Sequence, residues 1–192
     1  MRYTLLMIMG LIASFLFYSF LVYFPLANAL EEPHKKSLLI IGALLALQGV
    51  GAWIGRKFIY QKWKEKSPFF MIGIGLLISS FGLLCFGYTL SMDGLGFLLR
   101  GVGLGITTIV CLSAPIQYVN SLYVKDTAVI TRILQQIGGA LGCVFAGYLL
   151  HPLTQGYLSL NQTYLIFFLF SLTAFLLFCL VLSLSHKEKS AN

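Results

Sequence analysis

The chain has 192 residues, of which 58% are hydrophobic and only 10% are charged, and its formal net charge is +7. This composition leaves no room for a separate soluble domain, because the apolar residues form long runs joined by short connectors. The positive charge does not by itself indicate a nucleic-acid partner, since the basic residues fall between the apolar runs.

Six apolar stretches are each long enough to cross a bilayer, because about twenty helical residues cover a hydrocarbon layer of ~30 Å. Backbone groups in lipid must find partners within the protein, which here implies helices. We therefore expect an all-α membrane protein with one six-span domain over residues 1–192. The expected spans are 3–24, 37–54, 68–90, 95–118, 133–150 and 164–184.

The first span follows Arg2 and carries the polar residue Tyr18. It ends near Ala27 and Ala29, whose spacing fits a signal-peptide cleavage site. Its apolar run of about twenty residues is longer than the ~7–15 residues of a signal peptide. We expect it to be a membrane span.

The second and fifth spans each carry a pair of glycines four residues apart, Gly51 with Gly55 and Gly138 with Gly142. Residues at this spacing share one helix face, and small residues there let helix backbones approach closely in lipid. The sequence leaves open whether these faces pack within the bundle or against an external partner. The third and sixth spans are apolar nearly all round and are expected to face lipid.

The fourth span has the densest pattern, LLRGVGLGITT, and we favour it as the functional helix. An arginine at the centre of a bilayer costs at least ~2.5 kcal/mol, so Arg100 is expected either to face a wet cavity or to snorkel to the interface. Thr107 and Thr108 on the same span, with Tyr18 on the first, are the other candidates for a substrate cavity wall.

The basic residues alternate by connector. They are Arg2, then Arg56, Lys57, Lys62, Lys64 and Lys66, then Lys125 and Arg132, and finally Lys187 and Lys189. Basic residues of membrane proteins concentrate on the cytoplasmic side. We expect a multi-pass protein of the cell inner (plasma) membrane with both termini in the cytoplasm.

Chemical motifs are absent from the sequence. No GxSxG, HExxH or GxxxxGK[ST] pattern occurs, and the acidic residues are expected in connectors or the tail. Proton coupling generally needs a titratable group at depth in the membrane. We predict no enzyme activity, no cofactor, no metal site, and poor coupling to protons by this chain alone.

Four segments carry a resemblance to a known family: YFPLANAL, GRKFIYQKW, LLRGVGLG and TRILQQIGGALGCVFAGYLL. Together they resemble the last six spans of the fourteen-span drug:proton antiporters of the major facilitator superfamily. This resemblance implies a three-plus-three inverted repeat. It also implies that spans one and four line the cavity, that two and five pack against the opposite half, and that three and six face lipid.

The first half of such a transporter, where the resemblance would place the main proton-coupling carboxylates, is missing. We expect a half-transporter that moves amphipathic organic compounds outward and needs a second half, either another copy or a separate chain. The expected contact with that half is the glycine faces of spans two and five, and the other partners are the lipid bilayer and a small organic substrate. The alternative is a non-conducting structural or regulatory membrane subunit, or a truncated transporter remnant.

Overall fold

The computed structural model describes residues 2–31, 37–63, 66–86 and 89–190, and these contain helices and turns with no strand. The helices are α1 (Arg2–Glu31), α2 (Leu38–Ile54), α3 (Gln61–Trp63), α4 (Pro68–Leu83), α5 (Leu90–Ser113), α6 (Val124–Thr154) and α7 (Leu160–Ser190). A π-helical segment, η1 (Gly55–Tyr60), joins α2 to α3, and two 3-10 turns, η2 (Pro115–Tyr118) and η3 (Ser121–Tyr123), lie between α5 and α6.

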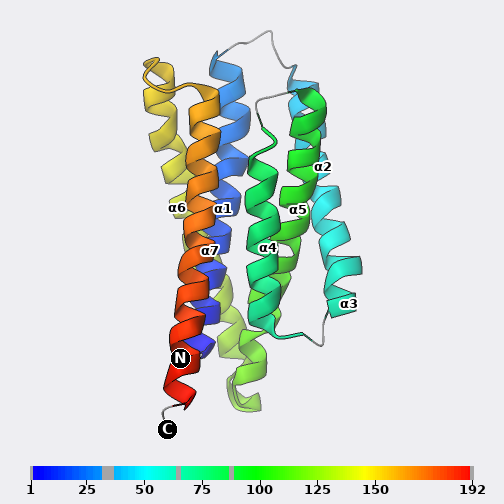
Figure 1. Ribbon diagram of the computed structural model, residues 1–192, viewed down its shortest axis with the longest axis vertical. Coiled ribbons are helices and arrows are strands. Elements are labelled where there is room, and N and C mark those ends of the chain that lie inside the picture. Colours follow the sequence, from blue (N-terminus) through cyan, green and yellow to red (C-terminus); the bar gives the residue numbers. More distant parts are fainter. Residues whose placement is uncertain (1, 32–36, 64–65, 87–88, 191–192) are drawn as a thin grey trace.

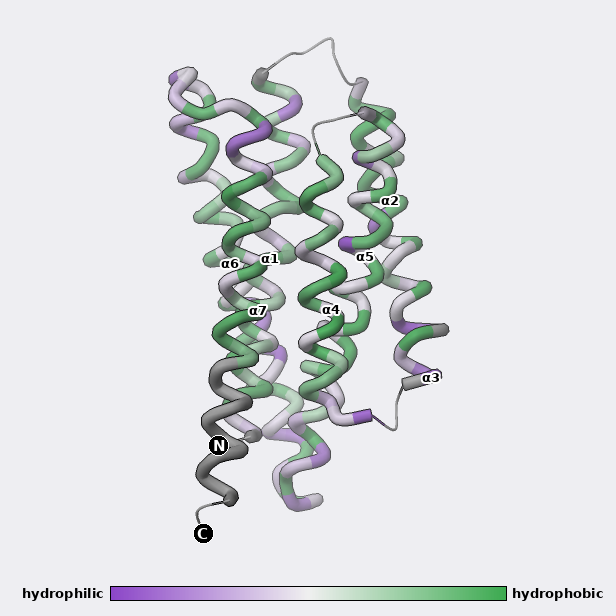
Figure 2. The backbone as a smooth tube through the Cα atoms, in the orientation of Figure 1, coloured by the Kyte–Doolittle hydropathy of each residue, from purple (hydrophilic) through white to green (hydrophobic). Residues whose placement is uncertain are grey.

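The chain has the character of a membrane protein, because five of its described helices are long and apolar enough to cross a bilayer. These are α1, α2, α5, α6 and α7. The remaining apolar helix, α4, has 16 residues and is therefore ~24 Å long, which is less than the hydrocarbon layer. Figure 2 shows hydrophobic residues along the length of the bundle, with hydrophilic residues gathered mainly at its two ends.

Several helix boundaries differ from the sequence prediction, and the starts of α5 and α6 come five and nine residues earlier than expected. The helix α5 begins at Leu90 because Thr89 caps it, with the side-chain oxygen accepting a hydrogen bond from the Met92 N–H at 3.3 Å. Asp93, which we had expected in a connector, therefore lies in the first turn of α5, where it is buried and where the helix dipole favours a negative charge. The helix α6 likewise begins at Val124, nine residues before the expected span.

The helices form two side-by-side groups. In one, α1 packs along α6, and in the other α5 packs against both α2 and α4. The two groups meet where α1 contacts α5 and where α4 contacts α7. Figure 1 shows that the first turn of α1 and the last turns of α7 lie at the same end of the bundle, which is also the end that holds α3.

Glycines explain why the paired helices lie so close. A Cβ atom added at Gly138 or Gly142 would collide with backbone carbonyl groups of α1, those of Leu11 and Phe15. A Cβ added at Gly51 or at Gly55 would collide with carbonyl groups of α5 in the same way. Both glycine faces are therefore used for packing within the chain, which is the first of the two alternatives that the sequence leaves open.

The third span, which is expected to face lipid, does so only in part, because most residues of α4 are buried while Phe70 and Phe81 are exposed. Its Gly75 and Gly82 lie against the backbone of α5 too closely for a Cβ atom. On its other side, the Ser80 and Ser171 hydroxyl groups hydrogen-bond at 2.7 Å and join α4 to α7. Small and hydroxylated residues thus place α4 between α5 and α7.

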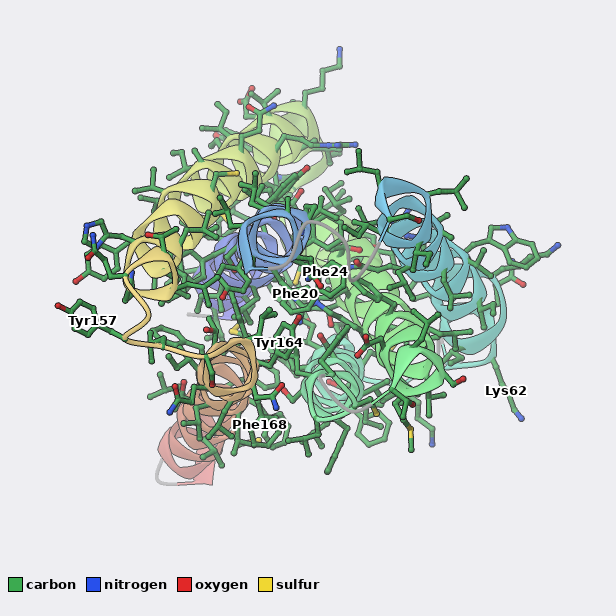
Figure 3. All side chains as sticks on the ribbon, turned by 90° about the horizontal axis from the view of Figure 1, so that it is seen from above. Phe20, Phe24, Lys62, Tyr157, Tyr164 and Phe168 are labelled. Carbon is green, nitrogen blue, oxygen red and sulfur yellow. The ribbon has the colours of Figure 1, made fainter. Side chains whose placement is uncertain are left out.

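Aromatic side chains fill the space between α1, α4, α5 and α7. Figure 3 shows Phe20, Phe24 and Tyr164 pointing toward one another in this region. The ring centroids of Phe24 and Phe97 lie 4.7 Å apart, edge to face, which is a favourable geometry for aromatic pairs.

We predict that Gly138→Ala lowers the free energy of unfolding by ~1–3 kcal/mol, because the new methyl group overpacks the contact between α6 and α1. Gly147→Ala is the matched control on the same helix, since no atom lies within 4 Å of its added Cβ. This control should be neutral or stabilising by up to ~1 kcal/mol. Unfolding of the purified protein in mixed micelles measures both, and equal effects of the two variants would contradict the packing described.

Candidate functional site

A cleft of about 810 Å³ opens on one side of the bundle. It is lined by Ser14, Phe17, Tyr18 and Leu21 of α1, Leu45, Gln48, Gly49, Ala52 and Trp53 of α2, Arg56 of η1, Gly101, Leu104, Gly105, Thr108 and Leu112 of α5, and Arg132, Gln135, Gln136, Gly139, Ala140 and Cys143 of α6. In the view of Figure 3, α2 and α6 stand on either side of α1 and α5. The helices α4 and α7 contribute no residue to this lining.

The cleft is mostly apolar, with a few polar groups among aromatic and aliphatic side chains. Its size falls within the ~300–1,000 Å³ of small-molecule sites, and its mixture of residues is also typical of them. The charged lining residues are Arg56 and Arg132, and no carboxylate lines the cleft. The described part of the chain has no group of His, Cys, Asp or Glu side chains arranged to hold a metal ion.

Two of the sequence candidates, Tyr18 and Thr108, line this cleft. The Tyr18 ring lies over Gly139 of α6, where an added Cβ would approach the ring to 2.8 Å, so the glycine makes room for the ring. The Thr108 hydroxyl donates to the Leu104 carbonyl at 2.7 Å. Its donor is therefore used within α5, and its oxygen can still accept a hydrogen bond.

The other two candidates, Arg100 and Thr107, lie outside the cleft lining. Thr107 is buried, and its hydroxyl donates to the Gly103 carbonyl at 2.9 Å on the side of α5 that faces α4. Arg100 is 1% exposed, so it neither faces a wet cavity nor snorkels to the interface. The reason is the early start of α5 at Leu90, which places Arg100 about three turns into the helix.

Arg100 instead connects α5 to α1. Its Nη2 donates to the Leu16 carbonyl, and its guanidinium carbon lies 4.4 Å from the centroid of the Phe20 ring, a cation–π contact. Its Nε and Nη1 have no hydrogen-bond partner among the described residues. A buried charge that is only partly bonded opposes folding, so the guanidinium stabilises the bundle mainly through its contacts and its volume.

Gln48 is the most unusual polar residue of the cleft. It lies on α2 and is only 3% exposed, although it contributes to the lining. Neither its Oε1 nor its Nε2 has a hydrogen-bond partner among the described residues. A buried unsatisfied polar group costs ~1–3 kcal/mol, so Gln48 is a candidate for ligand recognition.

The sequence interpretation missed most of the α6 wall. From the sequence, Arg132 has a role only in membrane topology, and neither Gln135 nor Gln136 is a candidate. The available signal was their spacing, because Arg132, Gln135, Gln136, Gly139, Ala140 and Cys143 recur every three or four residues and so share one face of a helix.

Neither a scan against protein-family models nor a search of curated proteins gives a match to this chain.

We predict opposite outcomes for two substitutions of Arg100. Arg100→Ala removes the contacts with Leu16 and Phe20 and leaves a cavity, so the free energy of unfolding should fall by ~2–4 kcal/mol. Arg100→Met keeps much of the volume and removes the buried charge, so stability should be unchanged or higher. Unfolding in mixed micelles measures both effects.

The matched control is Arg132→Ala, which truncates an exposed arginine of the cleft and should change stability by less than ~0.5 kcal/mol. If Arg100→Met destabilised the protein as strongly as Arg100→Ala, the contacts of the guanidinium would outweigh the penalty of burying its charge. That result would contradict the account of Arg100 given above.

Proposed function

We propose that this chain is half of a membrane transporter of the major facilitator type and that the cleft is its share of the substrate path. The observation that carries the proposal is the position of the cleft. Its lining comes from the first, second, fourth and fifth long apolar segments, and none comes from α4 or α7. The resemblance in sequence likewise implies that the third and sixth spans lie away from the path. On this proposal α4, although short, is the third of six spans.

Two correspondences between helix contacts support the proposed inverted repeat. If α1, α2 and α4 are related by a two-fold axis to α5, α6 and α7, the pair α1 with α6 corresponds to the pair α5 with α2. Both pairs form in the chain, and glycines bring the backbones together in both. The same axis exchanges α4 with α7, so the contact between these two helices corresponds to itself, and it too is present.

A second half is part of the proposal because the cleft is open to one side. The pairs Gly51 with Gly55 and Gly138 with Gly142 are already used within the chain. The second half would therefore contact the exposed faces of α2 and α6 beside the cleft. Exposed apolar residues such as Val50 of α2 and Leu141 of α6 are available there. The second half would be another copy of this chain or a separate chain.

The proposed orientation has both termini in the cytoplasm of a cell whose inner membrane holds the protein. The first turn of α1 and the last turns of α7 lie at one end of the bundle, and α3 lies at that end too. The basic residues Lys62 of α3 and Lys125 of α6 belong to this end. An excess of basic residues marks the cytoplasmic side of membrane proteins.

We expect the substrates to be amphipathic organic compounds, because apolar walls of Phe17, Trp53 and Leu104 stand beside the polar groups of Gln48 and Gln136. The chain would export such compounds, which enter from the membrane or the cytoplasm. A non-conducting structural subunit is the competing hypothesis, and it gives the cleft no role.

The proposal is tested by blocking the cleft. Ala140→Trp places a large side chain on the cleft wall and should reduce the flux of an amphipathic fluorescent dye at least ~10-fold. Flux is measured in proteoliposomes made with the protein and any chain that co-purifies with it, with and without a pH gradient.

Val144→Trp is the matched control, one turn further along α6. Val144 is 71% exposed and does not line the cleft, so this variant should transport the dye like the unsubstituted protein. Equal flux from Ala140→Trp and Val144→Trp would show that the cleft is not the path. Flux no greater than that of empty liposomes would favour the non-conducting subunit.

A further inference from the structure

The charges of the cleft all have one sign. Its two charged lining residues, Arg56 and Arg132, come from opposite walls, one from η1 after α2 and the other from α6. Both are exposed, and no ion pair of either is found within the described residues. With no carboxylate in the lining, the cleft attracts negative charge and repels positive charge.

The two arginines come from elements at the same end of the bundle. Arg56 precedes the end of α3 by about two helical turns, and Arg132 follows the start of α6 by about two turns, at the same end of the bundle. A guanidinium group donates paired hydrogen bonds to a carboxylate or a phosphate. Two such groups on facing walls can hold one anionic group from both sides.

Next to the arginines, the cleft wall carries aromatic side chains that can pack against the apolar part of a bound molecule. Trp53 lies one turn before Arg56 on α2, and Phe17 and Tyr18 face the cleft from α1. Gln48 lies about two turns from Arg56, with both of its amide atoms unbonded among the described residues. This buried amide is an independent indication of a ligand, because a polar group of a bound molecule can supply the bonds that the chain does not.

We propose that the cleft selects amphipathic anions, with the negative group between Arg56 and Arg132 and the apolar body along Trp53, Phe17 and Tyr18. This inference rests on the cleft that the proposed function uses, and it names the substrate class. The anion can be a free amphiphile such as a long-chain carboxylate or the headgroup of an anionic bilayer lipid, since both offer the same chemistry.

Trp53 reports binding directly, because it lines the cleft and the chain has only two tryptophans. The Trp63→Phe variant leaves Trp53 as the one tryptophan, and its emission is excited at wavelengths that tyrosine does not absorb. The probes are dibromostearate and dibromostearylamine, which carry the same quenching bromines on chains of opposite charge. They are titrated into the detergent-solubilised protein at a pH at which the carboxylate is ionised and the amine protonated.

Dibromostearate should quench Trp53 at about tenfold lower concentration than dibromostearylamine. In the same background, Arg56→Gln with Arg132→Gln should remove this preference, since about tenfold is the factor expected from the loss of two exposed ion pairs. Lys62→Gln with Lys125→Gln is the matched control. It removes the same charge from α3 and α6 at exposed positions outside the cleft, and the preference should remain.

A second arm identifies the source of the anion. The protein is placed in nanodiscs that contain either dibrominated phosphatidylglycerol or dibrominated phosphatidylcholine. The site is assigned to a bilayer lipid if only phosphatidylglycerol quenches Trp53 and if this quenching is lost in the double arginine variant. Quenching only by added dibromostearate would assign it to a free amphiphile. Either result supports the proposal.

Equal quenching by the two stearyl probes would overturn the proposal, and so would an equal loss of preference in the arginine and lysine variants. The measurement is independent of transport. A chain that binds dibromostearate selectively and moves no dye would refute the proposed function alone, whereas dye flux without selective binding would refute this inference alone.

Discussion

Direct contact between helix backbones at glycines is the constraint on which the rest of the structure depends. Without side chains at Gly138 and Gly142, α6 lies against the carbonyl groups of α1, and Gly51 and Gly55 allow the same approach of α2 to α5. In lipid there is no hydrophobic force between helices, so close packing of this kind is a main source of association. The two tight pairs leave the open space between them that forms the cleft.

The two sides of the bundle have opposite characters as a result. On one side α4 and α7 close the space with aromatic rings and the Ser80–Ser171 hydrogen bond. On the other side the cleft keeps polar groups such as Gln48 beside apolar walls. Arg100 lies between the groups and joins α5 to α1 through Leu16, so its charge serves the contact between helix pairs rather than the cleft surface.

The sequence predicted the helical class well, because the apolar runs are long enough to form membrane helices. It located Tyr18 and Thr108 in the cleft lining but not Arg100 or Thr107. Arg100 and Thr107 are seven residues apart and share one buried face of α5, whereas Thr108 lies about 100° further round the helix. Glycine spacing predicted close packing but not the packing partner, since a glycine face fits another helix of the same chain as well as one of a different chain. Burial of α4 depended on small residues of two other helices and could not be inferred from its own composition.

A cysteine scan along residues 132–148 of α6, in membranes and with a charged water-soluble thiol reagent, tests the central claim most directly. The account predicts rapid modification at positions 132, 136, 140 and at the native Cys143, which line the cleft. It predicts slow modification at position 146, which is buried, and at 137, 141 and 144, which are exposed outside the cleft. Modification that is uniform along the helix, or fastest at 137, 141 and 144, would contradict it.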